Sequence, residues 1–133
     1  MVPGGGALGR FRPSARRRRE KRRSMIHAQR MIETNPVPLD AGALAECIEA
    51  CFGCAQACAA YADACLGEED IQMLARCIRL DLDCADVCNA TGKILSRQVA
   101  FEPKMVGAAL WACVEACRRC ESACNNVLSG MEA

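Results

Sequence analysis

The pattern of hydrophobic and polar positions predicts three long helices. Apolar residues, with cysteine counted among them, recur at intervals of three and four over residues 40–66, 69–97 and 103–129. That spacing places them on one face of an α-helix. Gly67 is a typical residue for the end of the first long helix, and Pro103 suits the first position of the third. The links between the three segments are short, which favours antiparallel neighbours.

A shorter helix is predicted over residues 24–34, with Ser24 as its N-cap and the prolines of "NPVP" ending it. We therefore expect an all-α fold: an antiparallel, four-helix-bundle-like arrangement of three long cysteine-lined helices and one short N-terminal helix. Residues 1–23 are rich in glycine, proline and arginine and are expected to form a disordered basic arm. Residues 24–133 would then form the helical-bundle domain.

Cysteine occupies the helical face on which a bundle normally carries leucine or isoleucine. In "CIEACFGCAQAC" and "CVEACRRCESAC" the cysteines follow gaps of four, three and four, and the middle helix keeps the same grid with one position empty. The candidate metal ligands are all twelve: Cys47, Cys51, Cys54, Cys58, Cys65, Cys77, Cys84, Cys88, Cys113, Cys117, Cys120 and Cys124.

Two other residues interrupt these cysteine faces. Tyr61 stands where the spacing leads us to expect another cysteine, and Asp81 lies on the inner face of the middle helix. A buried carboxylate is costly unless it is paired. We expect Asp81 to pair with Arg76, Arg79 or a partner helix.

The cysteine spacing favours a soft monovalent metal ion. Residues four apart on a helix have Cβ atoms roughly 5–6 Å apart, so the thiolates of each Cys-x3-Cys pair can hold one ion between them. Cu(I) suits such thiolate ligands, and a face lined with them offers a row of sites. Since ligating thiols lose protons on binding, the metal-loaded form is expected to be the more stable one.

Other interpretations of the cysteines remain open. Zinc sites and iron–sulfur clusters favour Cys-x2-Cys on turns or loops, whereas that spacing falls inside helices here. A zinc or iron–sulfur protein serving structure or electron transfer is nevertheless a second hypothesis. Buried thiols without metal are a third. Disulfides are not expected, because two cysteines four apart on one helix are difficult to bridge.

Charge is unevenly distributed although the whole chain carries only +1. Residues 1–24 hold nine basic residues and one glutamate, a balance of +8, so the remainder carries −7. A metal-responsive regulator that uses this arm on DNA is a further hypothesis. The arm lacks periodicity, so we expect a disordered tail, or a translation start at Met25, and no nucleic-acid partner.

Neither a secretory signal nor a membrane span is expected, which predicts a reduced, cytoplasmic protein without a membrane partner. Enzymatic activity is not expected either. His27 is the only histidine, and a cysteine nucleophile needs such a base beside it. His27 is interpreted as a surface group, and Met25, Met31, Met73 and Met105 as core filler.

The motifs "LAECIEACFGCAQAC", "CIRLDLDCADVC" and "CVEACRRCESAC" resemble the four-helix-bundle copper storage proteins of bacteria, in particular their cytosolic branch. The resemblance covers roughly residues 31–130. It implies a storage or buffering protein that binds multiple Cu(I) ions through its cysteines and assembles into oligomers. It also matches Asp81 to an aspartate of the family's motif.

The chain departs from that family by lacking about one cysteine-rich helix with histidines near the bundle mouth. We expect a lower capacity as a result. Residues 24–34 or a partner chain would have to complete the bundle. Three helices alone would expose a thiol-lined groove, which favours self-association into a dimer or tetramer.

Overall fold

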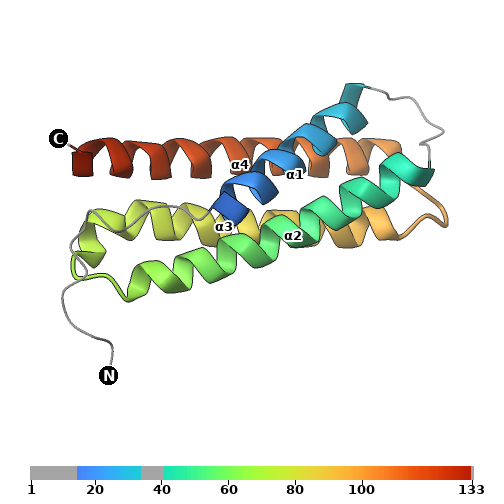
Figure 1. Ribbon diagram of the computed structural model, residues 1–133. Coiled ribbons are helices and arrows are strands. Elements are labelled where there is room, and N and C mark those ends of the chain that lie inside the picture. The colour runs from blue at the N-terminus through green and yellow to red at the C-terminus, as the bar shows by residue number, and fades with distance from the viewer. Residues whose placement is uncertain (1–14, 34–40, 133) are drawn as a thin grey trace.

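Four helices form a bundle in the computed structural model, which describes residues 15–33 and 41–132 (Figure 1). They are α1 (Ala15–Glu33), α2 (Ala41–Leu66), α3 (Ile71–Ser96) and α4 (Pro103–Glu132). Helix α1 packs on α2 and α4, while α3 packs on α2 and α4 from the opposite side. The predicted all-α helical bundle is confirmed.

The ends of the long helices follow local sequence signals. After α2 the N–H of Gly67 donates to the carbonyl of Ala64 at 3.1 Å. Asp70 caps α3, because its carboxylate accepts a hydrogen bond of 3.2 Å from the N–H of Met73. Pro103 begins α4, where a missing N–H costs nothing. The three long helices thus agree with the prediction to within a few residues.

Helix α1 differs from the prediction. It begins at Ala15, so the disorder expected for residues 1–23 is wrong for residues 15–23. Ser24 is a fully buried residue inside the helix and not an N-cap. The helix begins this early because one of its faces packs into the bundle. Arg17, Lys21 and Ser24 follow helical spacing on that face and are at most 2% exposed. The remaining residues of the predicted arm, 1–14, lie outside the described residues.

Polar contacts along α1 show that it runs antiparallel to α2. Arg16 Nη2 donates to Oε1 of Gln56 at 3.0 Å, and Arg23 lies 3.6 Å from Glu49. Further along α1, His27 lies 3.8 Å from Glu46. Helix α1 therefore covers the face that three helices alone would leave open.

The interior between the helices consists largely of sulfur. Leu74 and Leu95 are fully buried on α3, and Val106 and Leu110 on α4 are nearly so, but cysteine fills most other core positions. Helices α2 and α3 approach closely at Gly92. A Cβ atom there would lie 2.9 Å from the ring of Phe52, so only glycine permits this packing without a shift.

Helix α2 is long and apolar enough to cross a membrane by length and composition alone. No such stretch was expected from the sequence. Core helices of soluble proteins meet the same criterion, and the cysteine face of α2 is buried inside the bundle.

Candidate metal centre

All twelve cysteines line the interior of the bundle. Each is at most 1% exposed, although they come from three different helices. No thiol-lined groove is open among the residues that the structure describes, because α1 covers it. The sequence-based argument for self-association through such a groove therefore does not hold.

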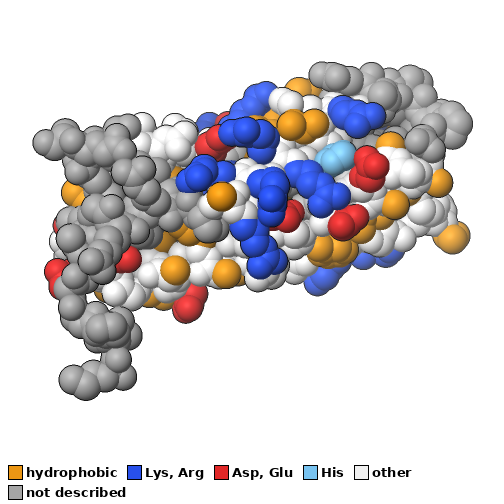
Figure 2. All heavy atoms as spheres, in the orientation of Figure 1, with side chains coloured by type: hydrophobic (Ala, Val, Ile, Leu, Met, Phe, Trp, Pro, Cys, Tyr) orange, Lys and Arg blue, Asp and Glu red, His pale blue; other side chains and the backbone are white. Residues whose placement is uncertain are grey.

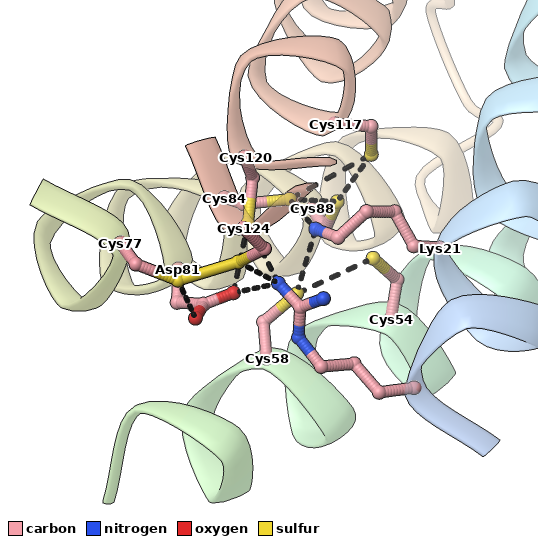
Figure 3. Close-up of polar contacts among 11 residues, drawn as sticks. Lys21, Cys54, Cys58, Cys77, Asp81, Cys84, Cys88, Cys117, Cys120 and Cys124 are labelled. Atoms are coloured by element: carbon pink, nitrogen blue, oxygen red, sulfur yellow. Dashed lines mark hydrogen bonds and ion pairs between the residues drawn. A yellow bond between two sulfur atoms is a disulfide. The ribbon is translucent and has the colours of Figure 1, made fainter. Parts of the chain in front are cut away.

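The largest ligand group contains four sulfurs. Cys54 of α2, Cys84 and Cys88 of α3 and Cys117 of α4 have Sγ atoms that all lie within 4.8 Å of one another (Figure 3). The Sγ of Cys84 is 3.6 Å from that of Cys117. Cys113 extends the group, since its Sγ lies 3.5 Å from that of Cys88. Sulfurs from three helices thus converge on one volume, as the helical spacing predicts.

A second group contains Cys58, Asp81 and Cys120, whose ligand atoms also lie within 4.8 Å of one another. The Cys120 thiol donates to Oδ1 of Asp81 at 2.8 Å. The Sγ of Cys58 is 3.8 Å from that of Cys54, which joins the two groups. The ligand groups are therefore continuous along the bundle.

The structure pairs Cys77 of α3 with Cys124 of α4 in a disulfide (Figure 3). This corrects the expectation of thiols throughout, which considered only cysteines on one helix. Cysteines on facing helices are not limited in that way, and the Cα atoms of this pair are 5.6 Å apart, within the range for bonded cysteines. With Asp81 these two residues form a third candidate ligand group.

Lys21 of α1 extends into the sulfur-lined interior (Figure 3). Its Nζ atom lies 3.1 Å from Sγ of Cys58 and 3.3 Å from Sγ of Cys84. Ser24, on the same face of α1, places its hydroxyl 3.9 Å from Sγ of Cys88 and 3.7 Å from Sγ of Cys113.

Arg17 forms a buried ion pair with Asp81. Its Nη2 atom also donates to Sγ of Cys120 at 2.9 Å, and the guanidinium carbon lies 4.1 Å from the centre of the Tyr61 ring. The partner of Asp81 is thus a residue of α1. Arg79, one of the expected partners, instead pairs with the neighbouring Asp83 at the surface.

The charges of these buried residues depend on one another. Burial raises the pKa of the Asp81 carboxyl, and the Arg17 guanidinium opposes that shift. Burial alone would lower the pKa of Lys21, but the sulfurs of Cys84 and Cys58 outweigh it and raise this pKa. Lys21 therefore stays a cation inside the bundle.

Among the cysteines, hydrogen bonds between neighbouring thiols and burial shift the pKa values in opposite directions. Hydrogen bonds from Cys120 and then Cys54 lower the pKa of Cys58, and the charge of Lys21 acts in the same direction. At the end of α2, burial and then the charge of Asp81 raise the pKa of Cys65 to about 12. Beside Lys21 the interior thus favours the thiolate of Cys58, whereas hydrogen bonds from neighbouring cysteines raise the pKa of Cys84.

Several predicted residues lie outside the three ligand groups. Four cysteines are buried in the same core but belong to none of them: Cys47, Cys51, Cys65 and Cys113. The side chain of His27 is only 16% exposed beside Glu46, so it is not the surface group expected from the sequence. Of the methionines, Met73 and Met105 are exposed, so they do not fill the core as expected, whereas Met25 packs against it.

Sequence reasoning missed the three polar residues of α1 that enter the core. A signal was present: positions 17, 21 and 24 continue the four-and-three spacing of the cysteine faces. The signal was masked because four of the five residues between these positions are arginines. Figure 2 shows these other cationic side chains gathered on the outer face of α1.

A closed helical bundle with a row of buried sulfur ligands defines a class of protein that binds soft metal ions. The family is shown by a match of residues 40–128 to the model described as copper storage protein. The chain therefore belongs to the copper storage protein family.

Known proteins support this assignment. A variant of Ccsp from Streptomyces lividans with one histidine replaced by alanine is 42% identical, with a TM-score of 0.56 over 70% of this chain and 98% of that one. The copper storage protein Ccsp from the same organism, loaded with 10 copper equivalents, is 38% identical, with a TM-score of 0.52 over 77% and 98%. An uncharacterized cysteine-rich protein, YhjQ of Bacillus subtilis (strain 168), is 35% identical over 59% of this chain and 68% of its own.

Proposed function

We propose that this protein stores or buffers copper by binding several Cu(I) ions among the thiolates inside its bundle, without catalysing a reaction. The single observation that carries the proposal is the continuous series of buried ligand groups contributed by α2, α3 and α4. An enzyme would need a substrate pocket and a base near one cysteine. A storage protein needs many similar ligands shielded from solvent, which is the arrangement seen here.

The distances between sulfurs suit a shared soft ion. Metal–thiolate bonds are about 2.3 Å long, so two sulfurs that share an ion lie at most about 4.6 Å apart. Neighbouring sulfurs in the four-cysteine group lie 3.6–3.9 Å apart, including Cys84 and Cys88 on one helix. Little movement would be needed to place an ion between two of them, and Cu(I) is well matched to thiolates.

We propose all twelve cysteines as ligands, with Cys77 and Cys124 available only after their disulfide is reduced. Helix α1 contributes no cysteine, so the capacity should be smaller than that of a bundle with thiols on all four helices. A cytoplasmic location follows from the same chemistry, because reducing conditions keep thiols free. Fractionation of cells that express the full chain would test this location.

An anaerobic titration of the reduced protein with Cu(I) against a chromophoric Cu(I) chelator tests storage. We expect several ions per chain to be withheld from the chelator. Cys117→Ser, which removes a member of the four-sulfur group, should lower the number bound. Ala112→Ser, an exposed position on the same helix, should not. Fewer than about two ions per chain for the unaltered protein would refute storage.

Zinc is a second candidate, favoured by one observation: four cysteines converge on one point, the ligand set of a structural zinc site. Metal analysis of the protein as isolated distinguishes the two. One tightly held zinc that excess Cu(I) does not displace would favour this alternative. Strong visible absorption from iron–sulfide charge transfer would favour an iron–sulfur cluster instead.

We also propose that the chain forms a homo-oligomer, on the basis of its family and of exposed apolar side chains. Trp111 of α4 is 56% exposed and Met105 on the same helix is 55% exposed. Contact with a second chain would remove such side chains from water, which is favourable for apolar surface. Sedimentation equilibrium of the metal-free and metal-loaded protein measures the oligomeric state directly, and a monomer in both would refute this proposal.

A further inference from the structure

Helix α1 places two cations against the proposed copper ligands. Lys21 Nζ lies between the sulfurs of Cys58 and Cys84, at 3.1 and 3.3 Å, and Arg17 contacts Asp81 and Cys120. Both side chains reach across the bundle to α3, although α1 itself packs on α2 and α4. Each is only 2% exposed.

Long cationic side chains are seldom buried this completely, because leaving water is costly unless opposite charge compensates. Here the compensation comes from one carboxylate and from the sulfurs that would bind copper. Lys21 and Arg17 thus supply the positive charge that metal ions would otherwise supply to the same atoms.

We propose that α1 is a displaceable cationic plug, whose Lys21 and Arg17 side chains occupy the ligand groups of the metal-free protein and withdraw as Cu(I) enters. This inference rests on the proposed copper binding and adds a means of regulating it. No bond is made or broken in α1. Cations of the protein are exchanged for cations of the metal at the same sulfurs.

Two physical effects drive the exchange. A Cu(I) ion bound to Cys58 or Cys84 places a positive charge close to Lys21 Nζ, and like charges repel strongly where water is scarce. Bonding to copper also takes the sulfur lone pairs that accept the hydrogen bonds of Lys21 Nζ, so Lys21 loses the contacts that held it. A plug of this kind lowers the affinity for the first ions bound, since each must displace a side chain.

Once its inward side chains withdraw, α1 keeps mainly surface contacts such as those of Arg23 with Glu49. We therefore expect α1 to loosen as copper loads, while α2, α3 and α4 tighten around the ions. The outer face of α1 is already strongly basic, and a loosened helix would add the charges of Arg17 and Lys21 to it (Figure 2).

Two measurements on the full chain test the plug. The first is hydrogen exchange of the reduced, unaltered protein, metal-free and after loading with Cu(I). Amides of residues 15–27 should exchange at least ten-fold faster in the loaded form, and those of α2–α4 equally fast or more slowly. Equal or slower exchange of α1 in a protein that binds copper would overturn the plug and leave copper storage intact.

The second measurement is competition with a chromophoric Cu(I) chelator. Lys21→Leu keeps the helical preference of the side chain, removes its charge and adds no metal ligand, and it should raise the affinity for the first ions at least ten-fold. Arg22→Leu removes the same charge from the exposed face of α1 and should change this affinity less than two-fold. Equal effects of the two variants would overturn the proposal. If the unaltered protein binds no copper, storage and plug both fail.

Discussion

The buried pair between Arg17 and Asp81 gives a sharp test of how α1 is held. Breaking a buried ion pair by removing one partner costs about 3–5 kcal/mol, because an uncompensated charge stays inside. We expect Asp81→Leu to cost the upper end of this range, since a guanidinium does not lose its proton. Arg17→Met should cost less, because Asp81 has a raised pKa and can become neutral while it keeps the Cys120 thiol 2.8 Å away.

The double variant Arg17→Met/Asp81→Leu should be much more stable than the sum of the single effects implies. It leaves no unpaired charge at this place, and apolar replacements of buried ion pairs are often neutral. We expect an interaction energy of about 3 kcal/mol or more. Urea unfolding of the metal-free protein, kept reduced and followed by far-UV circular dichroism, gives each free energy of unfolding.

An exposed pair on α4 supplies the control. Arg119 Nε donates to Oε1 of Glu115 at 2.8 Å, one turn away in the same helix, and both side chains are more than half exposed. Exposed pairs of this kind contribute about 0.3–0.5 kcal/mol. If the Arg17 and Asp81 variants were additive within about 0.5 kcal/mol, as distant residues are, the buried contact and the docking of α1 through it would be refuted.

Three further predictions concern stability. Gly92→Ala should lower the free energy of unfolding by about 1–3 kcal/mol, because the added Cβ atom would lie too close to the Phe52 ring of α2. Gly107→Ala places its Cβ atom in open space and should raise the free energy of unfolding by up to about 1 kcal/mol. Urea unfolding of the two variants compares these effects. Reducing the disulfide between Cys77 and Cys124, 47 positions apart, should lower the free energy of unfolding by about 4 kcal/mol, and an unchanged urea midpoint with and without reductant would contradict this. In the metal-free protein the raised pKa of Cys65 contributes stability below pH about 9 that is lost as pH rises towards about 12. The free energy of unfolding should therefore fall less steeply with pH over this range in Cys65→Ala than in the unaltered protein.

Much of the fold and of the thiol-lined interior could be predicted, because both follow from one periodicity. Cysteines three and four positions apart must share a helical face, and a bundle buries that face. Asp81 was recognised as needing a partner for the same reason, since its position on the grid is as clear as that of Cys84.

The role of α1 could not be predicted in this way. Its inward residues are basic, and a basic run with arginines on every side shows no contrast between an inner and an outer face. Burial of Lys21 depends on sulfurs from other helices, which no local pattern in α1 reports. The disulfide was missed for a related reason: spacing within one helix does not show which cysteines of facing helices meet.

Contacts of α1 fall into two sets with different responses to dissolved salt. Surface pairs such as that between Arg23 and Glu49 are open to counterions, so they weaken as the salt concentration rises. The inner contacts of Arg17 and Lys21 are closed to those ions. A rise in ionic strength should therefore weaken the surface contacts of α1, while the buried contacts of Arg17 and Lys21 change little.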